Sequence, residues 1–251
     1  MSGHSKWSTI KRKKGANDSR RSALFSKLIR EITVSARSGG EDINSNTRLR
    51  SAVNKAKENN MPSDNIERAI KRGIGAIEGV TYEEIRYEGY GPGGVAIMID
   101  CVTDSRNRTT AEIRSLFSKH GGNLGENGCV AYQFDKKGMI IIEEGQSDED
   151  EIMELLIDHG IEDIKTDDGN IILIISVDNH NEIYSIIKER NFKIIYNEIT
   201  YIPKTLTKLN EKKASQCLNL IELLEDNDDI QEVYSNYDIP DEIMSMISEG
   251  S

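Results

Sequence analysis

The spacing of apolar residues divides the chain into a helical first part and a longer part with strands. Before residue 78, apolar positions recur every three or four residues, which is typical of helices that bury one side. The pattern predicts helices from Arg20 to Gly39, over 47–59, and from Pro62 to Gly73. Because each helix has a single apolar stripe, we expect the three to pack into a small helical domain.

Beyond residue 80 the pattern changes to short apolar runs typical of strands. The runs 84–90 and 95–102 flank Gly91-Pro-Gly-Gly94, which predicts a hairpin. A helix over 108–120, with a capping box at Thr109-x-x-Glu112, and a strand over 129–134 are expected to follow.

From about residue 137 the predicted order is strand, helix, two strands, helix and strand, closing at Pro203. This β-α-β-β-α-β order is the split βαβ, or ferredoxin-like, arrangement. The helix predicted over 207–225 and the strand predicted over 230–237 lack partners of their own, and the segment 81–135 lacks closing elements. We therefore expect the ferredoxin-like segment to be inserted into the domain before it.

The fold class that follows is α+β with three domains: a small helical bundle followed by two α/β domains, the last ferredoxin-like and inserted in the second. The predicted boundaries are a flexible basic arm at 1–19, a helical domain at 20–78, an α/β domain at 79–135 plus 205–251, and the inserted domain at 136–204.

Charge changes this picture because it is divided unequally. Residues 1–72 contain 17 Lys and Arg against 7 Asp and Glu, whereas the other 179 residues contain 15 against 36. The whole-chain net charge of −11 conceals this difference. A basic first domain on an acidic body predicts contact with a polyanion through the first domain, and nucleic acid is the first candidate.

Sequence motifs for other chemistry are missing. None of the four histidines pairs with another at metal-ligating spacing, and no nucleophile-elbow or phosphate-loop motif occurs. The acidic run 148–151 lies at a predicted helix start, where carboxylates stabilise the helix dipole. No apolar run approaches the ~20 residues of a membrane span, and the basic start is not a secretory signal. We expect a cytoplasmic protein without enzyme activity, cofactor or metal.

The arm and the polar side of the first helix are the main candidate nucleic-acid contacts. The basic side chains can neutralise phosphates, and Trp7, the only tryptophan, has no core to fill in a polar arm but can stack on a base. An ordinary solvated tail and helix face is the alternative. The predicted contacts are His4, Lys6, Trp7, Lys11, Arg12, Lys13, Lys14, Arg20, Arg21, Lys27, Arg30 and Arg37.

A second candidate is an anion or RNA contact at Arg106 and Arg108. Both lie beside a predicted helix start, whose free N–H groups also favour an anion. The alternative, that the two arginines pair with carboxylates of the acidic body, is equally consistent with their spacing.

Several segments together resemble one family, the YebC/PmpR family of transcriptional regulators, which includes the mitochondrial translational activator of cytochrome c oxidase. The similarity is densest in Gly3-His-Ser-Lys-Trp7, 25–31, 65–72, 87–96 and Arg106-Asn-Arg-Thr109. The resemblance implies a three-domain α/β protein with a helical first domain, no catalytic activity and no cofactor. It also implies a role in gene expression, as a DNA-binding regulator or as a translation factor at the ribosome.

The expected function is therefore a non-enzymatic, nucleic-acid-binding regulator of gene expression that acts on DNA, with the acidic domains available to protein partners and no contact with membranes. The first alternative is a ribosome-associated translation factor that binds ribosomal RNA, because phosphate contacts carry no sequence information. A remote alternative is an enzyme that binds a phosphorylated metabolite at Arg106 and Arg108.

Overall fold

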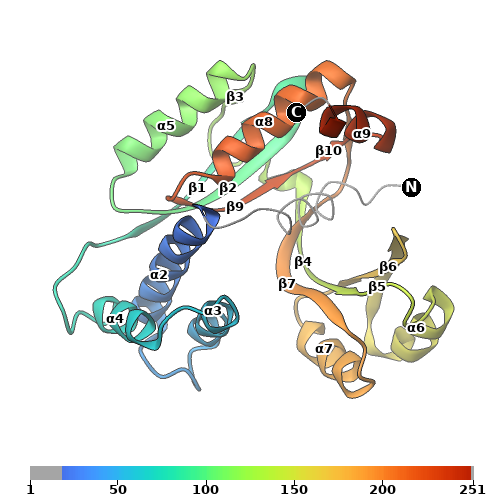
Figure 1. The fold of residues 1–251 in the computed structure, drawn as a ribbon, viewed down its shortest axis with the longest axis horizontal. Coiled ribbons are helices and arrows are strands. Elements are labelled where there is room, and N and C mark those ends of the chain that lie inside the picture. The colour runs from blue at the N-terminus through green and yellow to red at the C-terminus, as the bar shows by residue number, and fades with distance from the viewer. Residues whose placement is uncertain (1–18, 250–251) are drawn as a thin grey trace. The chain divides into compact units, whose positions relative to one another are not determined.

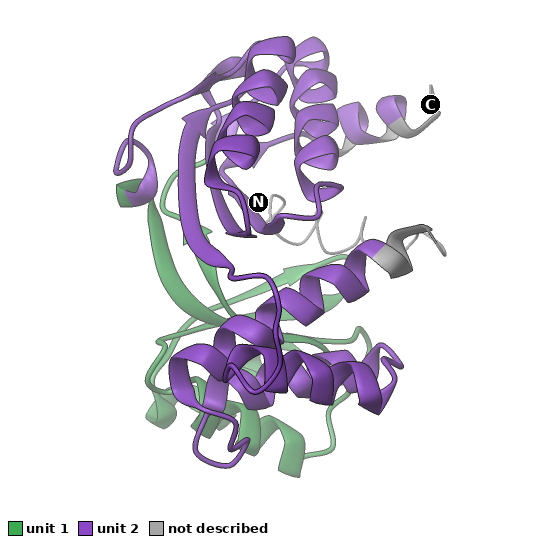
Figure 2. Cartoon of the chain, turned by 90° about the vertical axis from the view of Figure 1, so that its left-hand side faces the viewer, with its two compact units in different colours: residues 1–10, 132–206 green, residues 11–131, 207–251 purple. Residues whose placement is uncertain are grey.

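The computed structural model of the chain describes residues 19–249. These residues form two compact units, one made of residues 132–206 and the other of residues 19–131 together with 207–249 (Figure 2). The predicted fold class is confirmed: N-terminal helices are followed by antiparallel sheets. The arm at 1–19 lies almost wholly outside the described residues, and the exact boundaries of three domains remain a prediction.

Three helices, α2 (Ser19–Gly39), α3 (Thr47–Glu58) and α4 (Ser63–Gly73), pack around one small core. Ile32, Leu49 and Val53 are almost fully buried in it. Helices α2 and α4 approach so closely that a Cβ atom on Gly73 would lie 2.4 Å from the carbonyl oxygen of Thr33. A glycine at this position is what permits the contact.

The central sheet has the strand order β3-β1-β2-β9. The predicted hairpin is confirmed, since β1 (Glu83–Tyr90) pairs antiparallel with β2 (Ala96–Thr103). The late strand β9 (Ile230–Ser235) pairs with β2, so the chain returns to this sheet after the inserted segment. Helices α5 (Arg106–Lys119) and α8 (Glu211–Glu225) lie along the sheet (Figure 1) and share one core with it, in which Phe117 is fully buried.

Short elements complete this unit. They are β3 (Asn123–Leu124), the parallel pair β8 (Thr207–Lys208) and β10 (Tyr237–Asp238), and the helix α9 (Asp241–Glu249).

The unit at 132–206 has the predicted β-α-β-β-α-β order. It consists of β4 (Phe134–Ile142), α6 (Glu149–Leu156), β5 (Ile161–Asp167), β6 (Asn170–Ile175), α7 (His180–Glu189) and β7 (Ile194–Pro203). The sheet order β5-β6-β4-β7 is that of a ferredoxin-like fold. Its first and last strands are neighbours: Phe134 stands opposite Pro203, and the Lys204 N–H donates to the Gln133 carbonyl at 2.8 Å.

Two local predictions are wrong. Of the strand expected over 129–134, residues 129–133 form a loop that ends in a short 3₁₀ turn, Ala131–Gln133, and only Phe134 belongs to a strand, as the first residue of β4. The carboxylate of Glu88 accepts hydrogen bonds from the N–H groups of Gly128, Val130 and Ala131, each at 2.8 Å, so these groups cannot join a strand ladder. The capping box expected at Thr109 is also absent, because α5 begins at Arg106 and the Thr109 hydroxyl binds Asp229 instead.

No described helix is both long enough and apolar enough to cross a membrane.

Candidate nucleic-acid interface

Helix α2 has an apolar side and a cationic side. Leu28, Ile32 and Ala36 are buried in the core shared with α3 and α4. Lys27, Arg30 and Arg37 fall within a sector of about 100° on the helix, as expected from a rotation of about 100° per residue. The structure nevertheless places these three cations in two different settings.

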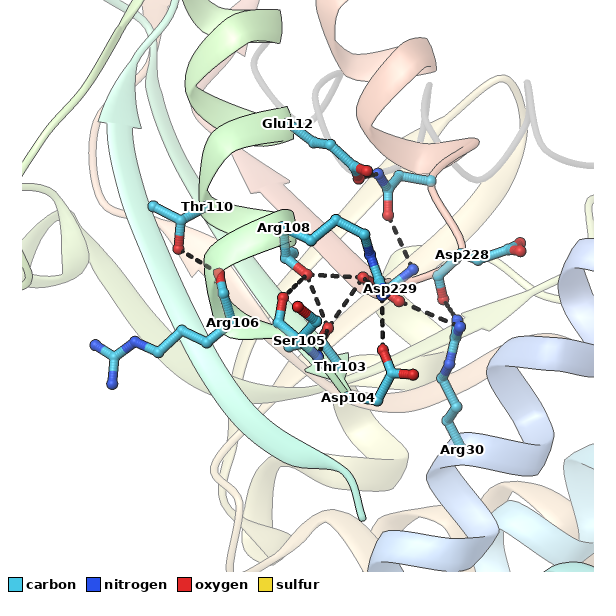
Figure 3. A network of polar contacts seen from close by, with 12 residues as sticks. Arg30, Thr103, Asp104, Ser105, Arg106, Arg108, Thr110, Glu112, Asp228 and Asp229 are labelled. Atoms are coloured by element: carbon cyan, nitrogen blue, oxygen red, sulfur yellow. Dashed lines mark hydrogen bonds and ion pairs between the residues drawn. The ribbon is translucent and has the colours of Figure 1, made fainter. Parts of the chain in front are cut away.

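Lys27 and Arg30 contact the acidic loop 225–229, which joins α8 to β9. The Lys27 ammonium donates to the carbonyl oxygen of Glu225, and the Arg30 guanidinium donates to the carbonyl oxygen of Asp228. Arg30 also forms an ion pair with the Asp229 carboxylate at 3.2 Å (Figure 3). The cationic side of α2 is thus partly neutralised within the chain.

Asp229 is the centre of this network. Its side chain is only 4% exposed, and it accepts hydrogen bonds from Arg108 at 2.8 Å, from Thr109 at 2.7 Å and from Thr103 at 3.0 Å (Figure 3). Burial alone would raise the pKa of Asp229. The hydrogen bonds from Arg108 and the two threonines, with the charge of Arg30, outweigh burial and lower that pKa below its usual range.

Arg106 and Arg108 have different surroundings although they are two residues apart. Arg108 donates to both Asp229 and Asp104, and these bonds raise its pKa further above its usual value. The exposed Arg106 side chain extends away from this network (Figure 3) and has no ion-pair partner within residues 19–249. The structure does not bring the two arginines together, so it shows no shared pocket for a phosphorylated metabolite.

Among the predicted contacts whose side chains the structure describes, Arg37 is the second exposed cation, after Arg106, that has no ion-pair partner in residues 19–249. It lines a groove together with Arg72 of α4 and Tyr82, which precedes β1. Arg72 and Tyr82 were not among the predicted contacts. Arg68 and Arg72 are four residues apart and therefore lie on the same side of α4, which the sequence could have indicated. Only the folded chain shows that Arg72 lines the same groove as Arg37.

The remaining predicted contacts are not placed. His4, Lys6, Trp7, Lys11, Arg12, Lys13 and Lys14 lie outside the described residues, and for Arg20 and Arg21 the structure gives only their position in the first turn of α2. Their contact with nucleic acid remains a prediction. Asp229, the residue that organises the described part of the site, was missed, although it ends an acidic run directly before a strand.

The fold and this site define a class of protein: a mixed α+β chain in which a cationic N-terminal helix contacts an acidic loop of the following α/β domain. Residues 5–76 match the family model described as the TACO1/YebC protein N-terminal domain, and residues 82–237 match the model described as the TACO1/YebC second and third domain. The chain belongs to the TACO1/YebC family.

Similar proteins agree with this assignment over nearly the full length. A "Probable transcriptional regulatory protein" of Syntrophus aciditrophicus is 53% identical, with 99% of this chain and 100% of the relative covered. A protein of the same description from Desulforapulum autotrophicum is 56% identical, with 97% and 98% covered. The crystal structure of a conserved hypothetical protein from Aquifex aeolicus is 44% identical and superposes with a TM-score of 0.80, covering 90% of this chain and 94% of that one.

Proposed function

We propose that the chain is a non-enzymatic regulator of gene expression that binds nucleic acid, with DNA as its target. The observation that carries this proposal is the charge division, 17 basic against 7 acidic side chains in residues 1–72. The description of its relatives as transcriptional regulatory proteins supports it.

The described contacts favour particular cations as phosphate ligands. Lys27 and Arg30 already have partners in the acidic loop 225–229, so a phosphate would have to compete with them. Arg37 and Arg106 are exposed and have no such competitor among residues 19–249. We therefore propose that phosphate contacts come chiefly from the basic arm, from Arg37 and from Arg106.

The salt dependence of binding tests the proposal. If five to eight phosphates are neutralised on duplex DNA, the slope of log K against log salt is expected to be about −0.9 per contact. Deleting residues 1–18 removes five cations, Lys6 and the Lys11-Arg-Lys-Lys14 run, so we expect at least about tenfold weaker binding and a slope shallower by up to about 4.5. Fluorescence anisotropy across a salt series measures both quantities.

A flat salt dependence, or equal binding by the shortened chain, would contradict the proposal. The same titration with structured ribosomal RNA fragments separates the two targets. Tighter binding to RNA at matched salt would favour the translation-factor alternative over DNA.

The pair Arg106 and Arg108 gives an internal comparison. Because the Arg106 side chain is exposed and unpaired, Arg106→Gln is expected to weaken DNA binding about threefold, to reduce the salt slope by about 0.9 and to leave the melting temperature unchanged. Arg108→Gln removes two hydrogen bonds to carboxylates, so it is expected to lower the melting temperature by several degrees. Thermal unfolding and fluorescence anisotropy measure both effects on both variants. Weaker DNA binding by Arg108→Gln together with a lower melting temperature of Arg106→Gln would contradict the roles given to the two arginines.

A further inference from the structure

The groove beside Arg37 has features that the charge argument does not explain. It has a volume of about 580 Å³, within the range of small-ligand pockets. Its walls come from α2, from the end of α4 and from the linker 75–82. All of these segments belong to one compact unit, so the groove is formed by a single body.

Two arginines without ion-pair partners among the described residues line the groove. Neither Arg37 nor Arg72 forms an ion pair with a described residue, and the Arg72 Nε is buried without a hydrogen-bond acceptor. The linker packs against the Arg72 stem so closely that a Cβ atom on Gly79 would lie 2.5 Å from the Arg72 Cδ. The Arg72 side chain is therefore held in place, with a donor that lacks an acceptor. Because Arg72 as a whole stays partly exposed, a guanidinium held in this way can bind an anion in the groove through its terminal nitrogens.

The linker adds an apolar and aromatic wall. Ile77 and Val80 are 38% and 50% exposed, although both are large apolar residues. Tyr82 lines the same groove, and the Arg30 guanidinium lies 5.7 Å from the centroid of its ring. A groove lined by both arginines and exposed apolar and aromatic side chains matches a phosphate joined to an exposed base.

We propose that this groove binds a nucleotide of a single-stranded nucleic acid, with Arg37 and Arg72 on the phosphate and with Ile77, Val80 and Tyr82 against the base. The inference rests on the proposed function and extends it, because a base within a duplex is stacked and cannot reach the apolar wall. An acidic peptide would also satisfy the arginines. The groove lies on the basic part of the chain and adjoins the cationic side of α2, which favours nucleic acid.

The test measures binding of fluorescein-labelled oligothymidylate and oligouridylate to the full chain. Arg72→Gln is expected to weaken binding by about three- to tenfold. Arg68→Gln is the matched control, because Arg68 is exposed on the same helix one turn earlier and does not line the groove. Glu78 is the acidic residue that lines the groove, and its negative charge repels a phosphate. Glu78→Gln is therefore expected to have the opposite effect and to tighten binding about twofold. The two oligonucleotides show whether the groove prefers DNA or RNA.

Equal binding by Arg72→Gln and Arg68→Gln would overturn the inference, and so would weaker binding by Glu78→Gln. If Arg72→Gln does not fold, Arg37→Gln and Glu78→Gln decide the outcome. Displacement of the oligonucleotide by poly-glutamate from the wild type but not from Arg37→Gln would assign the groove to an acidic protein partner instead. If the wild type shows no salt-dependent binding to nucleic acid, the proposed function itself is refuted. If binding depends on the arm but is unchanged by the groove variants, only this inference is refuted.

Discussion

Replacement of Asp229 by alanine is expected to lower the free energy of unfolding by about 3 kcal/mol. The Asp229 carboxylate is nearly inaccessible to water and accepts from Arg30, Arg108, Thr103 and Thr109. Its removal leaves two buried hydroxyl groups without this acceptor and leaves the Arg30 guanidinium, whose side chain is 15% exposed, without its carboxylate. Urea unfolding followed by circular dichroism measures the loss.

Asp104 is the matched control for this variant. It pairs with the same arginine at 2.7 Å, but its side chain is 34% exposed and Arg108 is 45% exposed. An exposed ion pair contributes little, so Asp104→Ala is expected to cost less than about 1 kcal/mol. Equal losses for the two variants would show that burial does not set the strength of this network.

The pH dependence of stability has a defined sign at Asp229. Because folding lowers its pKa, its contribution is fully present above the ordinary value of 3.8 and is lost as the pH falls through the lower folded-state pKa. Acid should therefore destabilise the wild type below about pH 4. Asp229→Ala is expected to show a smaller decrease over the same range.

Replacement of Glu88 by alanine is expected to destabilise the chain by about 3 kcal/mol, since it removes the acceptor of three main-chain N–H groups. Glu88 is only 4% exposed although it lies on a strand. Its two oxygens hold the loop that leads from β3 towards the inserted unit. Hydrogen exchange at Gly128, Val130 and Ala131 is expected to become faster in the variant than in the rest of the sheet.

Glu83→Ala, on the same strand at an exposed position, is the control for Glu88 and should change the free energy of unfolding by less than about 0.5 kcal/mol. Burial alone would raise the pKa of Glu88, but the three N–H groups and the charge of Arg86 lower it overall. Glu88 therefore stabilises the fold above its ordinary pKa of 4.5, and this contribution is lost as the pH falls through the lower folded-state pKa. Unchanged exchange at the three amides would contradict this role.

The elements that the sequence predicted well are those with local signals. Apolar spacing located α2, α3 and α4, and the order of strands and helices identified the ferredoxin-like unit. The partner of β2 could be inferred only from incomplete pieces, because β9 lies about 130 residues later in the chain.

The site was less predictable because its contacts are long-range. Arg30 meets Asp229 across 199 positions of sequence, and no spacing rule relates the two. Helix geometry separates one pair of candidate contacts, because residues two apart on a helix point about 200° apart. Arg106 and Arg108 could therefore not be expected to face one pocket once α5 was known to include both. The groove wall at 75–82 carries no periodic pattern, so nothing in the sequence indicated it.

The start of β4 and the end of β7 are neighbours, so the inserted unit can be described as a cassette, that is, a segment that leaves and rejoins its host domain at adjacent positions. Because the chain enters and leaves through adjacent, hydrogen-bonded positions at Gln133 and Lys204, a tight turn could join those two positions in place of the whole unit. Gain or loss of the cassette in a single genetic event would leave the path of the host domain unchanged. The ancestry of the host domain and that of the cassette can therefore differ, even though both now belong to one continuous chain.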